Sequence, residues 1–250
     1  MMPGFPCRLS RPQAIAQALL EQGELVAGSL ARQRKIRRWH RTIAMVASVQ
    51  LLLWTLSGLY FAFVDIDFVR GGQFRVDTTP EALSLGAVSL PVVSAKALRV
   101  QPRLQGELIV GVEQEAGTIW LDAAGADLAP LTAAEALLLG AQRTTLVLDQ
   151  IDWVDREEPG SEFRGAPLPL WRLYGEQDPT RVVYLDAFSG DVVAVRHEAW
   201  RWWDFLWSLH IMSYTDRDTI GTVLLKVFSI LALATAVLGV WLYVQTRRTT

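Results

Sequence analysis

The sequence predicts a membrane α-helical protein that carries an α+β domain between two spanning helices. Two uncharged apolar segments, Thr42–Val64 and Val227–Thr246, run for 23 and 20 residues. Each is long enough to cross a hydrocarbon core about 30 Å thick as a helix. The residues between them are polar, acidic and interrupted by turn-forming sequences, as in a folded domain.

The flanking charges predict the orientation of the two helices. Residues 1–41 hold 8 basic and 2 acidic side chains, a net charge of +6, whereas Asp65–Asp218 holds 13 basic and 24 acidic ones, a net charge of −11. Arg247 and Arg248 follow the second apolar segment. Because Lys and Arg in short flanks stay on the cytoplasmic side, both termini are expected on the cytoplasmic side of a bacterial inner membrane. Residues 67–216 are then periplasmic.

The outer residues divide into two units that we expect to be tandem helix-plus-hairpin folds. The predicted organisation, in chain order, is a cytoplasmic arm (1–37), a first transmembrane helix (38–66), a degenerate first unit (67–130), a second unit (131–198), an interfacial aromatic segment (199–216), a second transmembrane helix (217–245) and a cytoplasmic tail (246–250).

The second unit has the stronger local signals. Thr132 and Glu135 form a capping box, in which the hydroxyl and the carboxylate satisfy free backbone N–H groups, and this predicts a helix over Ala133–Gln142. Apolar segments separated by Asp-Pro and Ser-Gly turns predict the strands that follow. These strands are Leu168–Tyr174, Arg181–Asp186 and Val192–Val195.

A short internal repeat links the two units. Thr118–Ala129 is similar to Val182–Val193: each has an apolar strand, Leu-Asp-Ala, a glycine turn and a second strand. Asp122 and Asp186 stand at the first turn position, where the carboxylate accepts backbone N–H groups. Gly125 and Gly190 are expected to supply the positive φ of each hairpin.

A helix is predicted before each copy of the repeat, over Val92–Leu98 in the first unit and Ala133–Gln142 in the second. The shared order of helix, strand, turn and strand favours a duplication. Chance similarity over such a short segment is the alternative.

Seven segments together resemble the PepSY domain and PepSY-associated membrane proteins. They are Leu131–Leu137, Pro167–Leu173, Val183–Val192, Arg38–Arg41 with Leu56–Leu59, and Trp202–His210 with Leu238–Leu242. The resemblance implies an α+β extracytoplasmic module that binds or restrains partner proteins, in some cases peptidases. Larger four-helix relatives are associated with haem and with reduction of iron chelates. This chain has only two spans, so that activity does not transfer directly.

The sequence predicts neither catalytic residues nor a metal site. It has no HExxH motif, no pair of cysteines and no phosphate-binding glycine loop. His197 follows the last predicted strand, but no G-x-S-x-G nucleophile elbow accompanies it. A hydrolase is therefore not expected, and no nucleic-acid partner is predicted.

An acidic run surrounds Trp153 and is interrupted by Pro159 and Gly160. We expect a solvated, flexible loop there. Calcium binding through hard oxygen ligands and recognition of a basic partner are the alternatives. The acidic residues are Asp149, Asp152, Asp155, Glu157, Glu158 and Glu162.

His40 and His210 are candidate axial ligands of haem b. The predicted topology puts them on opposite faces of the membrane, so one chain cannot hold one haem between them. A parallel dimer would pair the two His40 side chains at one face and the two His210 side chains at the other, giving a two-haem relay across the bilayer. Amphipathic anchoring beside tryptophan is the alternative interpretation, and it requires no cofactor.

Four tryptophans gather before the second apolar segment: Trp200, Trp202, Trp203 and Trp207. Because tryptophan prefers the headgroup zone, we expect this segment to lie along the outer membrane interface as an anchor. Packing against the underside of the outer domain is the alternative.

These features predict a membrane-anchored binding module without catalytic activity, which regulates or assists another envelope protein. Its predicted partners are the lipid bilayer and either another envelope protein or a second copy of the chain. The competing hypothesis is a dimeric haem-binding subunit for transmembrane electron transfer, with iron-chelate reduction as its role.

Overall fold

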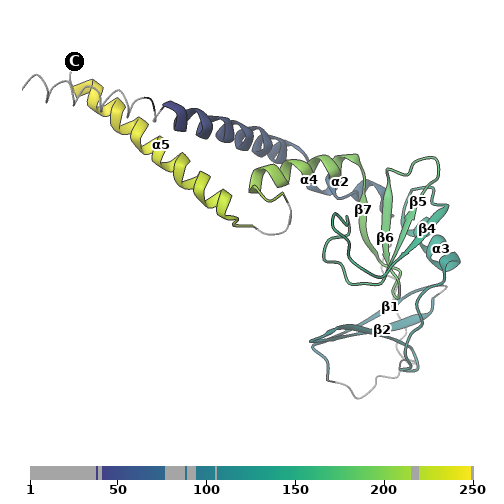
Figure 1. Ribbon diagram of the computed structural model, residues 1–250. Coiled ribbons are helices and arrows are strands. Elements are labelled where there is room, and N and C mark those ends of the chain that lie inside the picture. The colour runs from purple at the N-terminus through teal and green to yellow at the C-terminus, as the bar shows by residue number, and fades with distance from the viewer. Residues whose placement is uncertain are drawn as a thin grey trace, which may run out of the picture. The chain divides into compact units, whose positions relative to one another are not determined.

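The computed structural model describes residues 38, 41–76, 88, 94–104, 106–214 and 220–248 (Figure 1). The chain divides into two compact units. The terminal unit is formed by Met1–Ser57 with Ser208–Thr250, and the central unit by Gly58–Trp207. The predicted cytoplasmic arm and the candidate ligand His40 lie outside the described residues.

The terminal unit contains two helices that are long and apolar enough to cross a membrane. They are the helix Arg41–Phe63, which continues into the central unit, and α5 (Val223–Arg248), whose apolar part is Val223–Val240. More than half of the surface of many of their apolar side chains is exposed, including Leu52, Leu56, Ile230, Leu233 and Val237. Exposed apolar side chains with fully hydrogen-bonded helical backbone are what a lipid-facing helix requires.

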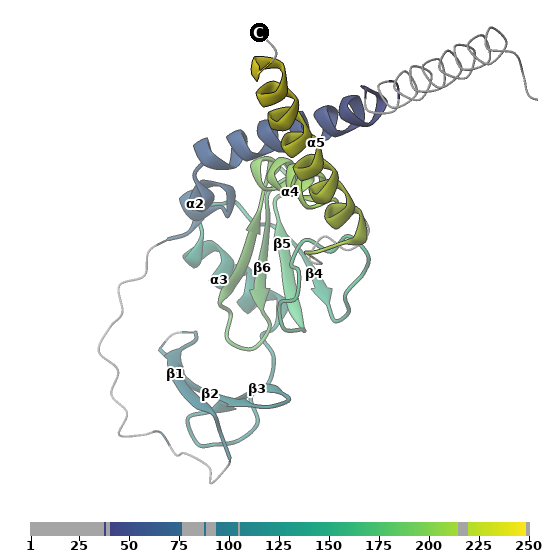
Figure 2. The ribbon, with the colours of Figure 1, turned by 90° about the vertical axis from the view of Figure 1, so that its left-hand side faces the viewer.

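The central unit is α+β and contains two small antiparallel sheets. Its elements follow the last turns of the helix Arg41–Phe63 in chain order (Figures 1 and 2). They are α2 (Ile66–Val69), η1 (Gly72–Phe74), β1 (Ala97–Pro102), β2 (Leu108–Gln114), β3 (Gly117–Asp122), α3 (Ala133–Arg143), β4 (Gln150–Val154), β5 (Leu170–Tyr174), β6 (Val182–Asp186), β7 (Val192–Arg196) and α4 (Glu198–Ile211).

The first sheet is the meander β1-β2-β3, and each strand pairs antiparallel with the next. One of its faces buries Val110, Val112 and Leu121. Gly111 of β2 lies opposite Trp120 of β3, and a Cβ at Gly111 would come within 2.8 Å of the indole ring. Only glycine therefore allows the ring to lie flat across β2 at this position.

The helix-plus-hairpin prediction for the first unit is wrong. Residues 94–98, the described part of the helix predicted over Val92–Leu98, are not helical, and Ala97 starts β1. Pairing with β2 over six residue pairs gives this segment more backbone hydrogen bonds than an isolated, uncapped turn of helix. The strand expected after Asp122 reduces to a single bridge between Leu121 and Asp127, because β3 pairs with β2 instead.

The second sheet has the order β4-β5-β6-β7, and α3 packs on one of its faces. The capping box is present as predicted: Glu135 N–H donates to Thr132 Oγ1, and Glu135 Oε2 accepts from Thr132 N–H at 2.8 Å. The core between helix and sheet consists of Leu131, Ala136, Leu139, Leu173, Val183, Leu185 and Val195. The opposite face packs beneath the β4–β5 connection, through Phe163, Leu170, Val182, Tyr184 and Ala194.

The acidic run is not a loop throughout, because β4 occupies residues 150–154. Asp152 lies directly across from Arg172 in the sheet, and their side chains are 3.1 Å apart. The neighbouring cross-strand pair, Trp153 and Trp171, makes an edge-to-face ring contact at 4.7 Å. Cross-strand charge and aromatic pairs of this kind stabilise an edge strand that a charged composition alone would disfavour.

Asp191, in the turn between β6 and β7, links the two sheets. One carboxylate oxygen accepts from Gln101 of β1 at 2.9 Å, and the other pairs with Arg143 at the end of α3 at 3.0 Å. The first sheet is thereby held to the second by a side chain rather than by shared backbone pairing.

The two ends of the central unit are fastened to each other. His197 is buried, and its Nε2 lies 3.0 Å from the carbonyl of Phe68 and 3.1 Å from that of Val69. Gly71 has φ +78° and lies so close to β7 that a Cβ would be 2.8 Å from that of Val195. The segment that leaves the first long helix therefore lies against the segment that enters α4.

Candidate functional site

A pocket of about 300 Å³ opens in the central unit where α2, the β7 edge and α4 meet. Arginine dominates its polar lining, although Asp65–Asp218 carries a net charge of −11. None of the described lining residues is acidic. The lining residues are Ile66, Val69, Arg70, Arg75, Arg164, Val193, Arg196, Trp200 and Trp203.

Arg196 and Trp200 form the inner wall of this arginine pocket. The Arg196 guanidinium lies 4.3 Å from the centre of the Trp200 ring, within cation–π range. Its Nε donates to the Glu162 carbonyl at 2.7 Å, and its Nη1 donates to the Val195 carbonyl at 3.2 Å. Burial lowers the pKa of Arg196 to about 10, against an attraction from the Glu162 carboxylate. The guanidinium is thus a desolvated cation held mainly by neutral acceptors.

Arg164 lies over the same indole, 5.3 Å from the ring centre, and is ion-paired with the buried Asp204 of α4. Its backbone has φ +37°, which a residue with a side chain rarely adopts. Strained backbone of this kind persists where surrounding contacts determine it, and it concentrates at functional sites. The ion pair with Asp204 and the stacking on Trp200 are two such contacts.

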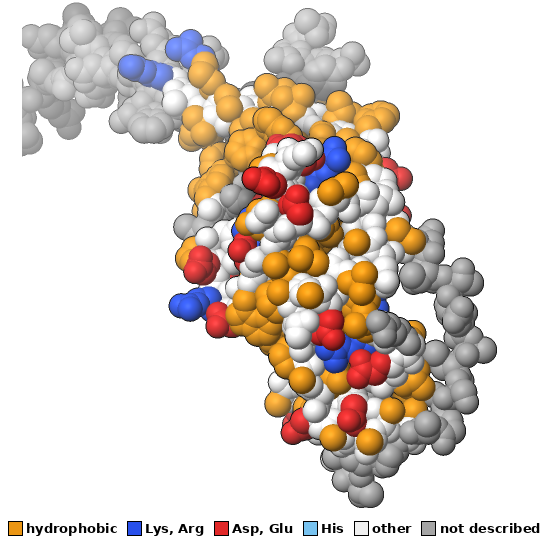
Figure 3. All heavy atoms as spheres, turned by 90° about the vertical axis from the view of Figure 1, so that its right-hand side faces the viewer, with side chains coloured by type: hydrophobic (Ala, Val, Ile, Leu, Met, Phe, Trp, Pro, Cys, Tyr) orange, Lys and Arg blue, Asp and Glu red, His pale blue; other side chains and the backbone are white. Residues whose placement is uncertain are grey.

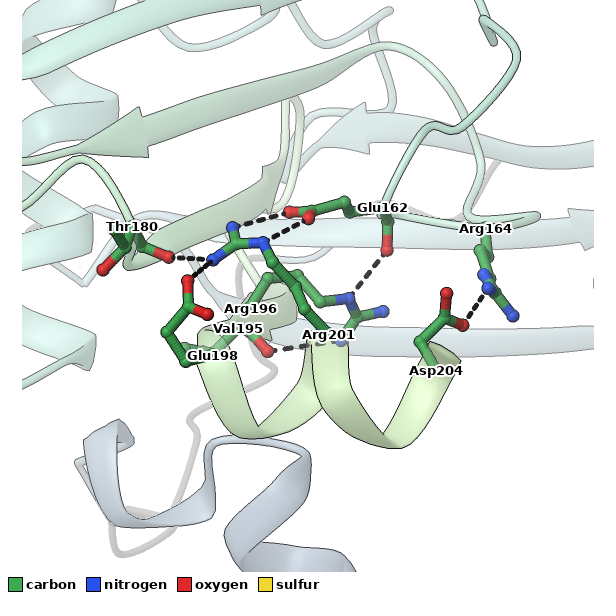
Figure 4. Close-up of polar contacts among 8 residues, drawn as sticks. All are labelled: Glu162, Arg164, Thr180, Val195, Arg196, Glu198, Arg201 and Asp204. Atoms are coloured by element: carbon green, nitrogen blue, oxygen red, sulfur yellow. Dashed lines mark hydrogen bonds and ion pairs between the residues drawn. The ribbon is translucent and has the colours of Figure 1, made fainter. Parts of the chain in front are cut away.

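A second ion-pair group lies next to Arg196 (Figure 4). Arg201 binds both carboxylate oxygens of Glu162, at 2.7 and 3.1 Å, and also reaches the Thr180 carbonyl and Glu198. The hydrogen bonds to Glu162 raise the pKa of Arg201. Both carboxylate oxygens of Glu162 accept from Arg201 of α4. Arg196 therefore binds the backbone carbonyl of Glu162 and not its carboxylate.

Arg75 and Arg70 complete the positive lining from the segment after the first long helix. Arg75 Nη1 donates to the Val192 carbonyl at 2.8 Å, and burial lowers the pKa of this guanidinium. Arg70 is exposed and follows directly after α2. Forked guanidinium donors beside two indole rings suit an anion with several oxygens, such as a phosphate or a carboxylate.

Comparison of the chain with models of known protein families, with curated proteins and with solved structures finds no match in any of the three. The pocket and the fold are therefore interpreted from their own chemistry.

His210 lies at the end of α4 and connects that helix to the first long helix. Its Nδ1 is 2.8 Å from Ser57 Oγ, and its backbone carbonyl accepts from Trp54 Nε1 at 2.8 Å. The structure brings His210 together with Trp54 and Ser57; His40, the other candidate haem ligand, is not described.

The four tryptophans of the predicted anchor occupy different environments. Trp200 is 8% exposed and lies inside the arginine pocket, whereas Trp202 is 59% exposed. Trp203 and Trp207 stack on each other at 5.3 Å, and Phe61 of the first long helix contacts both rings. Trp200 and Trp203 therefore line the pocket, Trp202 is exposed, and Trp203 and Trp207 contact the end of the long helix.

Four carboxylates of the acidic run have partners in the structure, including Asp155, which pairs with the adjacent Arg156 at 3.4 Å. Besides Asp152 and Glu162, the Asp149 carboxylate accepts from the Glu176 N–H at 2.7 Å. In the described segments, no group of three or more His, Cys, Asp or Glu side chains is arranged to hold a metal ion. The face of the molecule shown in Figure 3 carries acidic and basic side chains scattered among apolar ones.

Sequence reasoning missed the arginine pocket. Its arginines come from residues 70–75 and 164–196, so no window of the sequence contains them together. The four-residue spacing of Arg196 and Trp200 is no helical signal, because Arg196 ends β7 and Trp200 lies in α4.

Proposed function

We propose that this protein is a membrane-anchored, extracytoplasmic binding module of the PepSY type that regulates or assists another envelope protein. In this proposal the two long helices span the inner membrane, both termini are cytoplasmic and the central unit is periplasmic. The central unit binds an anionic ligand in its arginine pocket. The PepSY-like unit of this proposal is the second sheet with α3, in residues 131–198.

The arginine pocket is the observation that carries the proposal. The side chains described in its lining are arginine, tryptophan, valine and isoleucine, which bind and orient an anion but supply neither a nucleophile nor a proton acceptor near neutral pH. Partial burial of Arg196 beside carbonyl oxygens costs solvation that an anionic ligand would offset. Binding, rather than catalysis, is what such a lining favours.

Thermal unfolding of the full chain in a neutral detergent tests anion binding. Inorganic phosphate should raise the Tm of the wild type because a ligand that binds only the folded state stabilises it. Arg70→Gln removes an exposed pocket cation and should abolish the increase. Arg99→Gln is the matched control, since Arg99 is an exposed arginine on β1 of the same unit. Equal increases in all three proteins would mean an ionic-strength effect and would refute the pocket.

Extraction of the full chain from its own membranes without detergent tests the role as an accessory subunit. A specific envelope protein should co-purify in a fixed ratio and remain after washing with salt. A chain that elutes alone, with its central unit folded, would remove the support for a regulated partner.

The alternative of a haem-binding electron-transfer subunit rests on His210. Its Nδ1 is oriented by Ser57, and a metal-binding histidine often has its second ring nitrogen fixed in this way. His197 is buried against the carbonyls of Phe68 and Val69, so His210 is the one candidate ligand in the described part of the chain. Two axial histidines would require a second copy of the protein. An absorption spectrum after haem-replete expression decides: a Soret band that His210→Ala abolishes supports haem, and its absence in the wild type excludes it.

A further inference from the structure

The arginine pocket lies close along the chain to the end of the first long helix. Ile66, Val69 and Arg70 all fall within seven residues of Phe63, the last residue of that helix. Trp203 lines the pocket and also contacts Phe61, with ring centres 5.4 Å apart. The aromatic wall of the pocket is therefore continuous with the last turn of an apolar helix.

The length of that helix sets the level of the pocket. The 23 residues of Arg41–Phe63 extend about 34 Å at 1.5 Å per residue, which matches a hydrocarbon core of about 30 Å. If this helix spans, Phe63 lies at the boundary with the headgroups. The pocket residues that follow within seven positions are then at headgroup level, where tryptophan is enriched.

The lining combines two kinds of surface. Arg70, Arg75, Arg164 and Arg196 provide guanidinium donors, while Ile66, Val69 and Val193 provide apolar contacts. Among the described residues, the hydrogen-bond acceptors of Arg75 and Arg196 are backbone carbonyls. A ligand that brings a negative group attached to an apolar body would complement both surfaces.

We propose that the arginine pocket binds the phosphate of an anionic phospholipid from the leaflet in which the first long helix ends. This inference rests on the proposed function, because it names the ligand of the same pocket. The phosphate lies among the guanidinium groups and the beginning of the acyl chains lies against Ile66 and Val69. Bound lipid fixes the height of an acidic domain that an anionic membrane surface would otherwise repel.

Native mass spectrometry of the full chain, released from nanodiscs, measures the lipid retained. Nanodiscs containing phosphatidylglycerol and phosphatidylcholine are compared with nanodiscs of phosphatidylcholine alone. Wild type and Arg99→Gln should retain phosphatidylglycerol, and Arg70→Gln should retain it about tenfold less, the loss expected for one charge-assisted contact. Arg75→Lys keeps the charge without the forked donors, and should give an intermediate loss.

Hydrogen exchange on the same nanodiscs locates the lipid. Residues 65–76 and 193–204 should exchange more slowly when phosphatidylglycerol is present, in the wild type but not in Arg70→Gln. Equal retention by wild type and Arg70→Gln would overturn the inference, since the lipid would then be bound by general adsorption.

The two proposals can fail separately. If phosphate raises the Tm in an Arg70-dependent manner but phosphatidylglycerol is not retained, the pocket takes a soluble anion and only the lipid inference fails. If neither ligand binds, both proposals fail. If hydrogen exchange in the pocket slows only when an acidic partner protein is bound, the pocket binds that protein and the lipid inference is overturned.

Discussion

The turns that follow β3 and β6 have the same local chemistry in different surroundings. In one, Asp122 Oδ1 accepts from the N–H groups of Ala124 and Ala126; in the other, Asp186 Oδ1 accepts from Phe188 and Ser189. The first turn leads into a single bridge, and the second into β7, which pairs with β6 in a sheet covered by α3. A shared short sequence therefore specifies a shared turn, while the partner of the strand is determined elsewhere.

Matched core substitutions should show the largest difference between the two copies. Leu121 and Leu185 immediately precede the two aspartates, but Leu185 is fully buried between sheet and helix whereas Leu121 is 7% exposed in a smaller cluster. We expect Leu185→Ala to lower the free energy of unfolding by about 4 kcal/mol and Leu121→Ala by about 2 kcal/mol. Urea titration of the full chain in mild detergent measures both. Equal losses would mean that the two sheets form one cooperative core.

The glycine of each turn gives the next largest contrast. Gly125 and Gly190 have φ values of +85° and +69°, so alanine strains the backbone at either position. At Gly190 an added Cβ would also lie 2.6 Å from a methyl group of Leu139 in α3. Gly190→Ala should therefore cost about 3 kcal/mol and Gly125→Ala about 1 kcal/mol. A change in Tm of the same size for both variants would contradict the close approach of α3.

The aspartates themselves should behave alike. Asp122→Ala and Asp186→Ala each remove a carboxylate oxygen that accepts two backbone N–H groups, at a cost of about 1–2 kcal/mol per variant. Asn keeps an acceptor at the same position, so Asp122→Asn and Asp186→Asn should recover most of the loss. A large difference between the two alanine variants would show that the turns are not equivalent.

The capping box has no counterpart in the first sheet and should give the smallest effect. Thr132→Ala should cost about 1 kcal/mol. The hydrogen bonds from Thr132 lower the pKa of Glu135 below its ordinary value of 4.5. A depressed carboxyl pKa stabilises the fold above pH 4.5, and this contribution is lost as the pH falls through the folded-state pKa. Urea titrations between pH 3 and pH 6, roughly the range over which a carboxyl titrates, should show a steeper loss in wild type than in Thr132→Ala. Parallel curves would contradict the contribution of the Thr132 hydroxyl to the lowered pKa of Glu135.

The sequence signals that proved correct act over a few residues. Thr132 and Glu135 are three positions apart, and the turns before β6 and β7 are marked by Asp178-Pro179 and Ser189-Gly190. β2 was not predicted from the sequence, because its four consecutive buried residues, 109–112, give no alternating pattern of apolar and polar side chains. β4 escaped because its acidic composition resembles a loop, and only its partner Arg172 on β5 explains Asp152.

The arginine pocket also could not be predicted from the sequence, but the reason differs from that for β2 and β4. Arg75 and Arg196 are 121 positions apart, and their proximity depends on how η1 lies against the β7 edge. The net charge of Asp65–Asp218 is strongly acidic on average, and this average conceals a local excess of positive charge. Three-dimensional packing, rather than composition, creates this site.

The contacts between the two ends of the central unit impose an order on its folding during synthesis. β1, β2 and β3 pair with one another within residues 97–122, so the first sheet can form soon after these residues are made. α2 and Arg75, although made earlier, must wait for Val192 and His197. If synthesis stops before Val192, α2 and Arg75 lack the residues that they contact. The pocket then also lacks the lining residues of β7 and α4. The pocket is thus complete only when the chain has been made as far as α4.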